Sequence, residues 1–69
     1  MSVLKINGAE KVFDLQLPVT LTALLVQLDV NAETVVAEVD GRIVERSEFE
    51  KTKLSSGQAI ELVRFVPGG

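Results

Sequence analysis

The N-terminal residues alternate between apolar and polar side chains in the way that paired β-strands do. Residues 3–6 are a β-prone run that stops at Asn7-Gly8, the dipeptide best suited to the two positive φ angles of a tight hairpin turn. Residues 11–17 follow with a period of two, which predicts a half-buried strand with the odd positions facing inward. The inward side chains are all apolar: Phe13, Leu15 and Leu17. The pattern therefore predicts a pair of strands at the start of the chain.

The apolar spacing then changes to that of an α-helix. Leucines recur at positions i, i+3, i+4 and i+7, which form one apolar stripe: Leu21, Leu24, Leu25 and Leu28. Thr20 fits the N-cap position, where its hydroxyl can accept a hydrogen bond from a free backbone N–H. Asp29 opposes the helix dipole at the C-terminal end. We therefore expect packing, rather than capping, to hold this short helix.

Three more strands are predicted in the C-terminal half. Residues 34–39 and 42–45 have strand patterns and are joined by Asp40-Gly41, a second hairpin turn signal. In the first of them, one face carries small and branched apolar side chains: Val35, Ala37 and Val39. Two residues of the polar stretch that follows are expected to reach the core: Phe49 and Leu54. A turn then leads to the last strand, residues 58–66, and the whole order predicts an α+β domain.

Composition limits the chemistry that this chain can hold. Its 69 residues are 46% hydrophobic and 25% charged, which is typical of one small globular domain. The absence of Cys and His excludes a disulfide scaffold, a zinc finger, a thiol nucleophile and a histidine general base. Three carboxylates gather in one polar turn, and we interpret them as solvated rather than catalytic: Glu45, Glu48 and Glu50. We expect a protein that is not an enzyme and binds no metal.

The net charge and the lack of targeting signals limit the partners and the location that we expect for this protein. The formal net charge of −3 argues against nucleic-acid binding and favours a basic partner surface. The first residues lack the basic and apolar regions of a signal peptide. No apolar run approaches the roughly 20 residues that cross a bilayer. We therefore expect a cytoplasmic protein that binds no membrane.

The last strand and the residues after it are the main functional candidates. Ile60 and Leu62 have core parity, whereas Val63 and Phe65 lie on the face that Glu61 marks as solvated. These two apolar side chains are covered by the chain itself, are scattered surface residues, or form an exposed docking patch. Arg64 has core parity but lies near the end of the strand, where it can reach water.

The C-terminal residues Pro67, Gly68 and Gly69 form a thin peptide with few side chains. Glycine permits close approach, so a rigid sheet that ends in this peptide could thread a carboxylate into the cleft of another protein. The alternative is a frayed end or a truncated chain. The sequence leaves both interpretations open.

The order and spacing of several segments resemble the ThiS family, the sulfur carriers of thiamine biosynthesis. The matching segments are residues 19–25, 39–49 and 54–63, followed by Gly68-Gly69. This resemblance implies a ubiquitin-like β-grasp domain over residues 1–66, with a flexible carrier tail at 67–69. It implies a mixed sheet of four to five strands on one short helix, with the first and last strands adjacent and parallel.

The resemblance also implies a function. A ubiquitin-activating-like adenylyltransferase would use ATP to adenylate the Gly69 carboxylate. A cysteine desulfurase would supply sulfur to form a thiocarboxylate, and a thiazole synthase would receive that sulfur. The chain itself would bind no cofactor and would dock through Val63, Arg64 and Phe65, with Pro67 and Gly68 as the tail.

The sequence departs from the family pattern at four positions: Glu45, Phe49, Gln58 and Pro67. The first three are interpreted as structural, whereas proline at the root of the tail fixes φ and stiffens it. Three other functions remain open: the small subunit of molybdopterin synthase, a protein modifier joined to lysines through Gly69, and a passive interaction domain.

Overall fold

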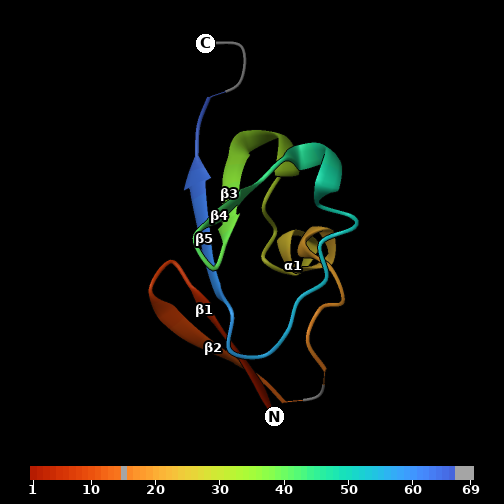
Figure 1. Cartoon of the computed structure of the whole chain (residues 1–69), viewed down its shortest axis with the longest axis vertical. Coiled ribbons are helices and arrows are strands. Elements are labelled where there is room, and N and C mark those ends of the chain that lie inside the picture. The colour runs from red at the N-terminus through yellow and green to blue at the C-terminus, as the bar shows by residue number, and fades with distance from the viewer. Residues whose placement is uncertain (15, 67–69) are drawn as a thin grey trace.

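The computed structural model describes residues 1–14 and 16–66. In these residues the chain forms five strands, one α-helix and two short 3-10 turns (Figure 1). Their bounds are β1 (Ser2–Ile6), β2 (Ala9–Phe13), α1 (Leu21–Gln27), η1 (Ala32–Thr34), β3 (Val35–Val39), β4 (Arg42–Val44), η2 (Arg46–Glu48) and β5 (Ala59–Arg64). The order of the strands and the helix is the predicted one.

The strands form one mixed sheet with the last strand in its middle. The order across the sheet is β2-β1-β5-β3-β4. β1 and β5 are parallel, and the other neighbouring pairs are antiparallel. The predicted α+β class, the mixed sheet and the parallel pairing of the first and last strands are confirmed.

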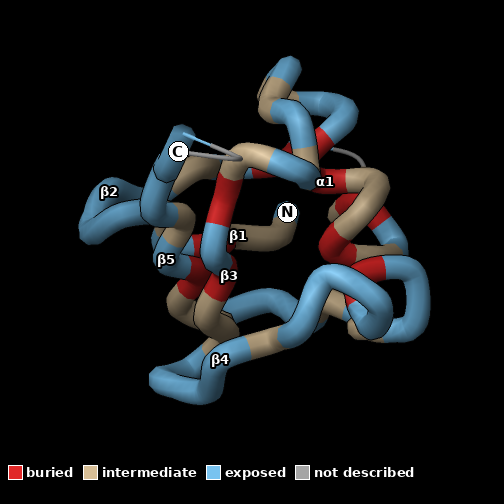
Figure 2. The backbone as a smooth tube through the Cα atoms, turned by 90° about the horizontal axis from the view of Figure 1, so that it is seen from above, coloured by how far each residue is buried: buried red, intermediate tan, exposed pale blue. Residues whose placement is uncertain are grey.

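The core lies between α1 and one face of the sheet. Figure 2 shows the buried residues on the helix and on the strands that face it, while most turns are exposed. The buried apolar side chains are Leu4, Phe13, Leu21, Leu24, Leu25, Val35, Ala37, Phe49 and Ile60. Both predicted anchors reach this core, Phe49 as a buried residue and Leu54 as a half-buried one. The opposite face of the sheet carries no helix in the described residues.

Both predicted hairpin turns are present, and both need left-handed backbone. The φ angles are 51° and 84° at Asn7 and Gly8, and 50° and 83° at Asp40 and Gly41. Two consecutive positive φ angles characterise the type I′ turn, whose twist matches that of the strands it joins. The turn chemistry read from the two dipeptides therefore fixes both hairpins.

The second strand differs from its predicted bounds of residues 11–17. β2 begins earlier, at Ala9, and ends at Phe13, which lies opposite Ser2 at the very start of β1. Pairing therefore ends at the first residue of β1, and the described residues Asp14, Gln16 and Leu17 belong to no strand. Leu17 still packs against the core, and Leu15 lies outside the described residues.

The three C-terminal strands are shorter than predicted, whereas β1 begins one residue earlier, at Ser2. Thr34 belongs to η1, and Glu45 precedes η2 without being part of β4. β5 spans Ala59–Arg64 instead of residues 58–66. The Gln58 side chain instead accepts a hydrogen bond from the backbone N–H of Ser55 at 2.8 Å, which closes the turn before β5. That bond supports the structural interpretation of this departure from the family pattern.

The helix is capped at both ends. The Thr20 hydroxyl accepts a hydrogen bond from the Ala23 N–H at 3.2 Å, which confirms the predicted N-cap. At the C-terminus, Asp29 is left-handed, with φ of 59°. Its N–H donates to the Val26 carbonyl at 3.1 Å, and the Val30 N–H donates to the Leu25 carbonyl at 2.9 Å.

These two bonds form a Schellman motif, which satisfies carbonyls that the helix end would otherwise leave free. The expectation that packing alone would hold the helix is therefore wrong at its C-terminus. The sequence indicates only the unfavourable charge of Asp29. Its left-handed backbone conformation is what makes this cap.

Replacing Asp29 by glycine should stabilise the fold. Glycine adopts the left-handed conformation without strain, and the change removes a negative charge from the negative end of the helix dipole. We expect Asp29→Gly to raise the free energy of unfolding by about 0.5–1 kcal/mol in urea titrations. Asp29→Ala is the control, because it removes the charge and keeps the Cβ atom. Equal stability of the two variants would contradict the backbone part of this explanation.

Candidate functional site

The chain stays hydrogen-bonded to β3's neighbouring residue one position beyond the end of β5. The Phe65 N–H donates to the Thr34 carbonyl at 2.9 Å, one residue beyond the end of the strand. In Figure 1, β5 points away from the N-terminus, and the described chain ends beyond the sheet. The predicted tail residues Pro67, Gly68 and Gly69 lie outside the described residues. The division into a domain of residues 1–66 and a tail therefore stays a prediction.

The two hairpin turns hold β5 from both sides. The Leu62 N–H donates to the Asn7 side-chain Oδ1 at 2.7 Å, and the Asn7 N–H donates to the Ile60 carbonyl at 2.8 Å. On the other side, the Ala59 N–H donates to Asp40 Oδ1 at 2.8 Å, and the Asp40 N–H donates to the Ala59 carbonyl at 2.8 Å. Each turn side chain thus serves as an acceptor where its own strand has ended.

Val63 and Phe65 are exposed, which excludes the interpretation that the chain itself covers them. Two further apolar residues, which the sequence alone did not indicate as docking candidates, lie beside them on the open face. Val36 lies directly opposite Val63, and Ile43 follows on β4, opposite Glu38. The exposed fractions are 42% for Val36, 70% for Ile43, 58% for Val63 and 44% for Phe65. We call these four residues the outer-face patch.

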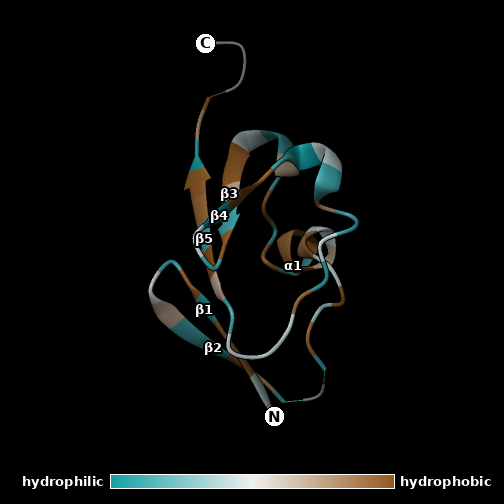
Figure 3. Cartoon of the chain, viewed as in Figure 1, coloured by the Kyte–Doolittle hydropathy of each residue, from teal (hydrophilic) through white to brown (hydrophobic). Residues whose placement is uncertain are grey.

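The outer-face patch extends over three adjacent strands, β5, β3 and β4. Figure 3 shows that apolar residues dominate β5 and the start of β3. Strand periodicity places Val36 on the face opposite to Val35, Ala37 and Val39. The period of two was enough to place it there, but its position beside Val63 depends on strand register, which the sequence does not state.

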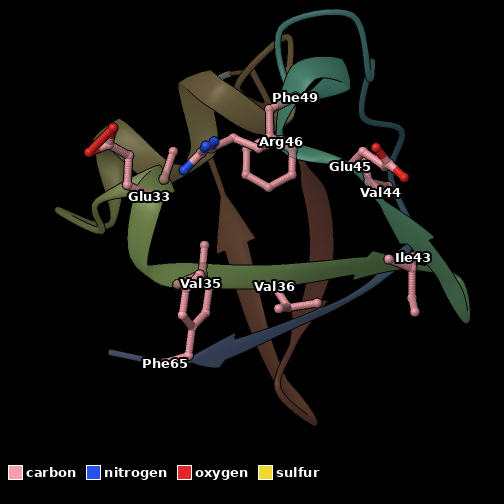
Figure 4. Close-up of a pocket in the computed structure, with 10 residues that line it drawn as sticks. Glu33, Val35, Val36, Ile43, Val44, Glu45, Arg46, Phe49 and Phe65 are labelled. Atoms are coloured by element: carbon pink, nitrogen blue, oxygen red, sulfur yellow. The ribbon is translucent and has the colours of Figure 1, made fainter. Parts of the chain in front are cut away.

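An open groove of about 460 Å³ borders the outer-face patch. Pairing between β3 and β4 ends at Val44, so the first two residues of β3 have partners on β5 alone. In Figure 4, Val36 and Ile43 point to one side of the β3 and β4 ribbons, while Arg46 and Phe49 lie on the other. Phe65 lines the same groove. The hollow is lined mainly by apolar side chains, so it can add contact area to a docking surface.

Arg64 does not belong to the outer-face patch. It lies opposite Val35, on the side of the sheet that faces the core, and its side chain is exposed. There it borders a second hollow together with Leu28 and Leu62. The structure therefore brings together two of the three predicted docking residues, Val63 and Phe65, and places the third on the other side.

The carboxylates of the polar turn form no reactive cluster. Glu45, Glu48 and Glu50 are exposed, and Glu48 forms an ion pair with Lys51 at 3.7 Å. In the part of the chain that the structure describes, no three potential metal ligands come together. No helix in that part is long and apolar enough to cross a membrane.

A helix on one face of a mixed five-stranded sheet, with a parallel β1 and β5 in the middle, defines a ubiquitin-like β-grasp domain. The sequence profile of the ThiS family matches residues 2–69, which is nearly the whole chain. The chain therefore belongs to the ThiS family, which its sequence resembles.

Two solved structures are similar over almost their full length. The crystal structure of a thiamine biosynthesis protein (ThiS) from Geobacter metallireducens is 35% identical, with a TM-score of 0.83, and the match covers 97% of this chain and 99% of that one. The solution structure of a thiamine biosynthesis protein from the same organism is 36% identical, with a TM-score of 0.78, covering 100% and 88%.

A curated relative is much longer. A protein of Paramagnetospirillum magneticum (strain ATCC 700264 / AMB-1) named thiazole synthase is 35% identical over 66 residues, which are 96% of this chain. The chain spans 20% of the length of that relative.

Proposed function

We propose that this chain is a sulfur carrier whose Gly69 carboxylate is adenylated and converted to a thiocarboxylate, which donates sulfur to thiazole formation in thiamine biosynthesis. The observation that carries the proposal is the family match, which extends from residue 2 to residue 69 and so includes Gly68 and Gly69.

The chemistry needs no reactive side chain on the carrier. The Gly69 carboxylate attacks the α-phosphorus of ATP and releases pyrophosphate, which leaves a mixed anhydride with AMP. The terminal sulfur of a cysteine persulfide then displaces AMP to form an acyl disulfide. A thiol attacks the cysteine sulfur of this disulfide, forms a new disulfide with it and releases the thiocarboxylate. Activation belongs to the partner enzymes, as is usual for group carriers. The absence of Cys and His from the sequence is compatible with this role.

The fold supports a carrier because it separates docking from chemistry. The outer-face patch gives partners an apolar surface, and the hydrogen bond from Phe65 to Thr34 fixes where the chain leaves the sheet. The proposed partners are a ubiquitin-activating-like adenylyltransferase, a cysteine desulfurase as the sulfur source and a thiazole synthase as the receiver. The longer relative named thiazole synthase contains a segment similar to this chain, which supports that choice of receiver.

Intact-mass spectrometry tests the carrier chemistry. After incubation with the adenylyltransferase, ATP and a sulfur source, the chain should gain about 16 Da, because one terminal oxygen is exchanged for sulfur. A variant that lacks Gly69 is the control and should gain nothing. An unchanged mass of the complete chain would refute the proposal. Transfer of sulfur to a molybdopterin synthase but not to a thiazole synthase would assign the chain to the alternative carrier.

Phe65→Asp should weaken partner binding without unfolding the domain. The substitution places a charge in the centre of an apolar contact, and we expect a loss of about 1–3 kcal/mol of binding free energy. Val26→Asp is the matched control, because Val26 is exposed on α1, outside the outer-face patch. Titration calorimetry with the adenylyltransferase measures both variants. Unchanged affinity of Phe65→Asp would exclude the outer-face patch as the docking surface.

A further inference from the structure

Two like charges lie on the same face of the sheet as the outer-face patch, next to its residues. Glu38 on β3 lies directly opposite Glu61 on β5. Residues directly opposite in an antiparallel pair have Cβ atoms about 5 Å apart, and like charges in this position destabilise a sheet. The pair is flanked by the apolar neighbours Val36 and Val63 on one side and by Ile43 on the next strand. Glu38 is half-buried among them.

The described residues provide no cation for this pair. The ion pair between Lys51 and Glu48 is the one formed within residues 1–14 and 16–66, and it lies away from the sheet. Lys5 is on the same face, opposite Glu10 on β2 and Ala59 on β5, and it forms no ion pair with Glu61. Arg42 and Arg64 lie opposite Val39 and Val35, so both are on the side of the sheet that faces the core. The open face therefore combines apolar residues with two uncompensated carboxylates.

We propose that the outer-face patch docks a partner surface in which an arginine or lysine, surrounded by apolar side chains, is inserted between Glu38 and Glu61. The apolar residues of the outer-face patch supply contact area, and the two carboxylates decide the sign of the partner's charge. This inference rests on the proposed function, because it describes the surface that the adenylyltransferase presents to the carrier.

Charge complementarity selects this partner over a second copy of the chain. A symmetric dimer through the outer-face patch would bring two Glu38–Glu61 pairs together, because a two-fold contact uses the same surface on both copies. The chain also has a net charge of −3, so approach of two copies is repulsive. A basic partner surface instead compensates the repulsion between Glu38 and Glu61 that is present in the free carrier.

This arrangement makes opposite predictions for stability and for binding. Replacing both glutamates in Glu38→Gln/Glu61→Gln keeps their shape and removes the repulsion, so the urea midpoint should rise. The same variant should bind the adenylyltransferase about tenfold more weakly, because a charge pair at the interface is lost. Its binding should also lose much of its dependence on salt. A substitution that only damaged the fold would lower the urea midpoint.

The experiment measures affinity for the adenylyltransferase at low and high salt, together with urea unfolding, for the wild type, both single variants and the double variant. Glu50→Gln is the matched control, because it removes an exposed carboxylate outside the outer-face patch. The proposal is overturned if the double variant binds as tightly as the wild type, or if it is less stable than the wild type. Dimerisation of the wild type through this face in sedimentation experiments would also overturn it.

Failure of this inference is distinguishable from failure of the proposed function. If only the inference is wrong, the wild type still acquires sulfur, and the glutamine variants do so with equal affinity for the enzyme. If the carrier function is wrong, the wild type acquires no sulfur at any enzyme concentration.

Discussion

The position of the last strand in the middle of the sheet is the constraint on which the rest of this structure depends. β5 pairs with β1 on one side and with β3 on the other, so the two ends of the described chain are joined through one ladder of hydrogen bonds. Asn7 and Asp40 extend that ladder with their side chains after their own strands have ended. A strand held on both sides gives the residues that follow it a fixed starting point.

The open face of the sheet follows from the small size of the domain. A domain of this length buries only about 60% of the surface that its unfolded chain exposes. One short helix covers one face, and Ile60 on β5 contributes to the core there. The same strand presents Val63 to the other side. β5 therefore supports the core, carries part of the outer-face patch and leads to the C-terminal residues.

Local chemistry made much of the fold predictable from the sequence. The dipeptides Asn7-Gly8 and Asp40-Gly41 predicted both hairpins, because few other residue pairs tolerate two positive φ angles. The leucine stripe and the N-cap threonine predicted the helix. The period of two identified the strands but overestimated the lengths of β2, β3, β4 and β5, because pairing ends where the neighbouring strand ends.

Features that depend on register between distant strands could not be predicted. The pairings of Val36 with Val63 and of Glu38 with Glu61 join segments about 25 residues apart, and only the folded sheet defines them. The hydrogen bonds between the Asn7 and Asp40 side chains and β5 also depend on how distant strands pair, so the sequence did not predict them. For the candidate site, strand parity already placed Arg64 on the face opposite to Val63 and Phe65, and the structure shows that these two side chains are exposed. Their role in docking stays a prediction.

Native-state hydrogen exchange tests most directly whether the turns hold β5. The amides of Ala59 and Leu62, which donate to the Asp40 and Asn7 side chains, should exchange only when the whole domain unfolds. The Ile43 amide, on the edge strand β4, should exchange much faster. This account predicts an opening free energy at Ala59 and Leu62 equal to that of global unfolding. Exchange at these two amides as fast as at Ile43 would contradict it.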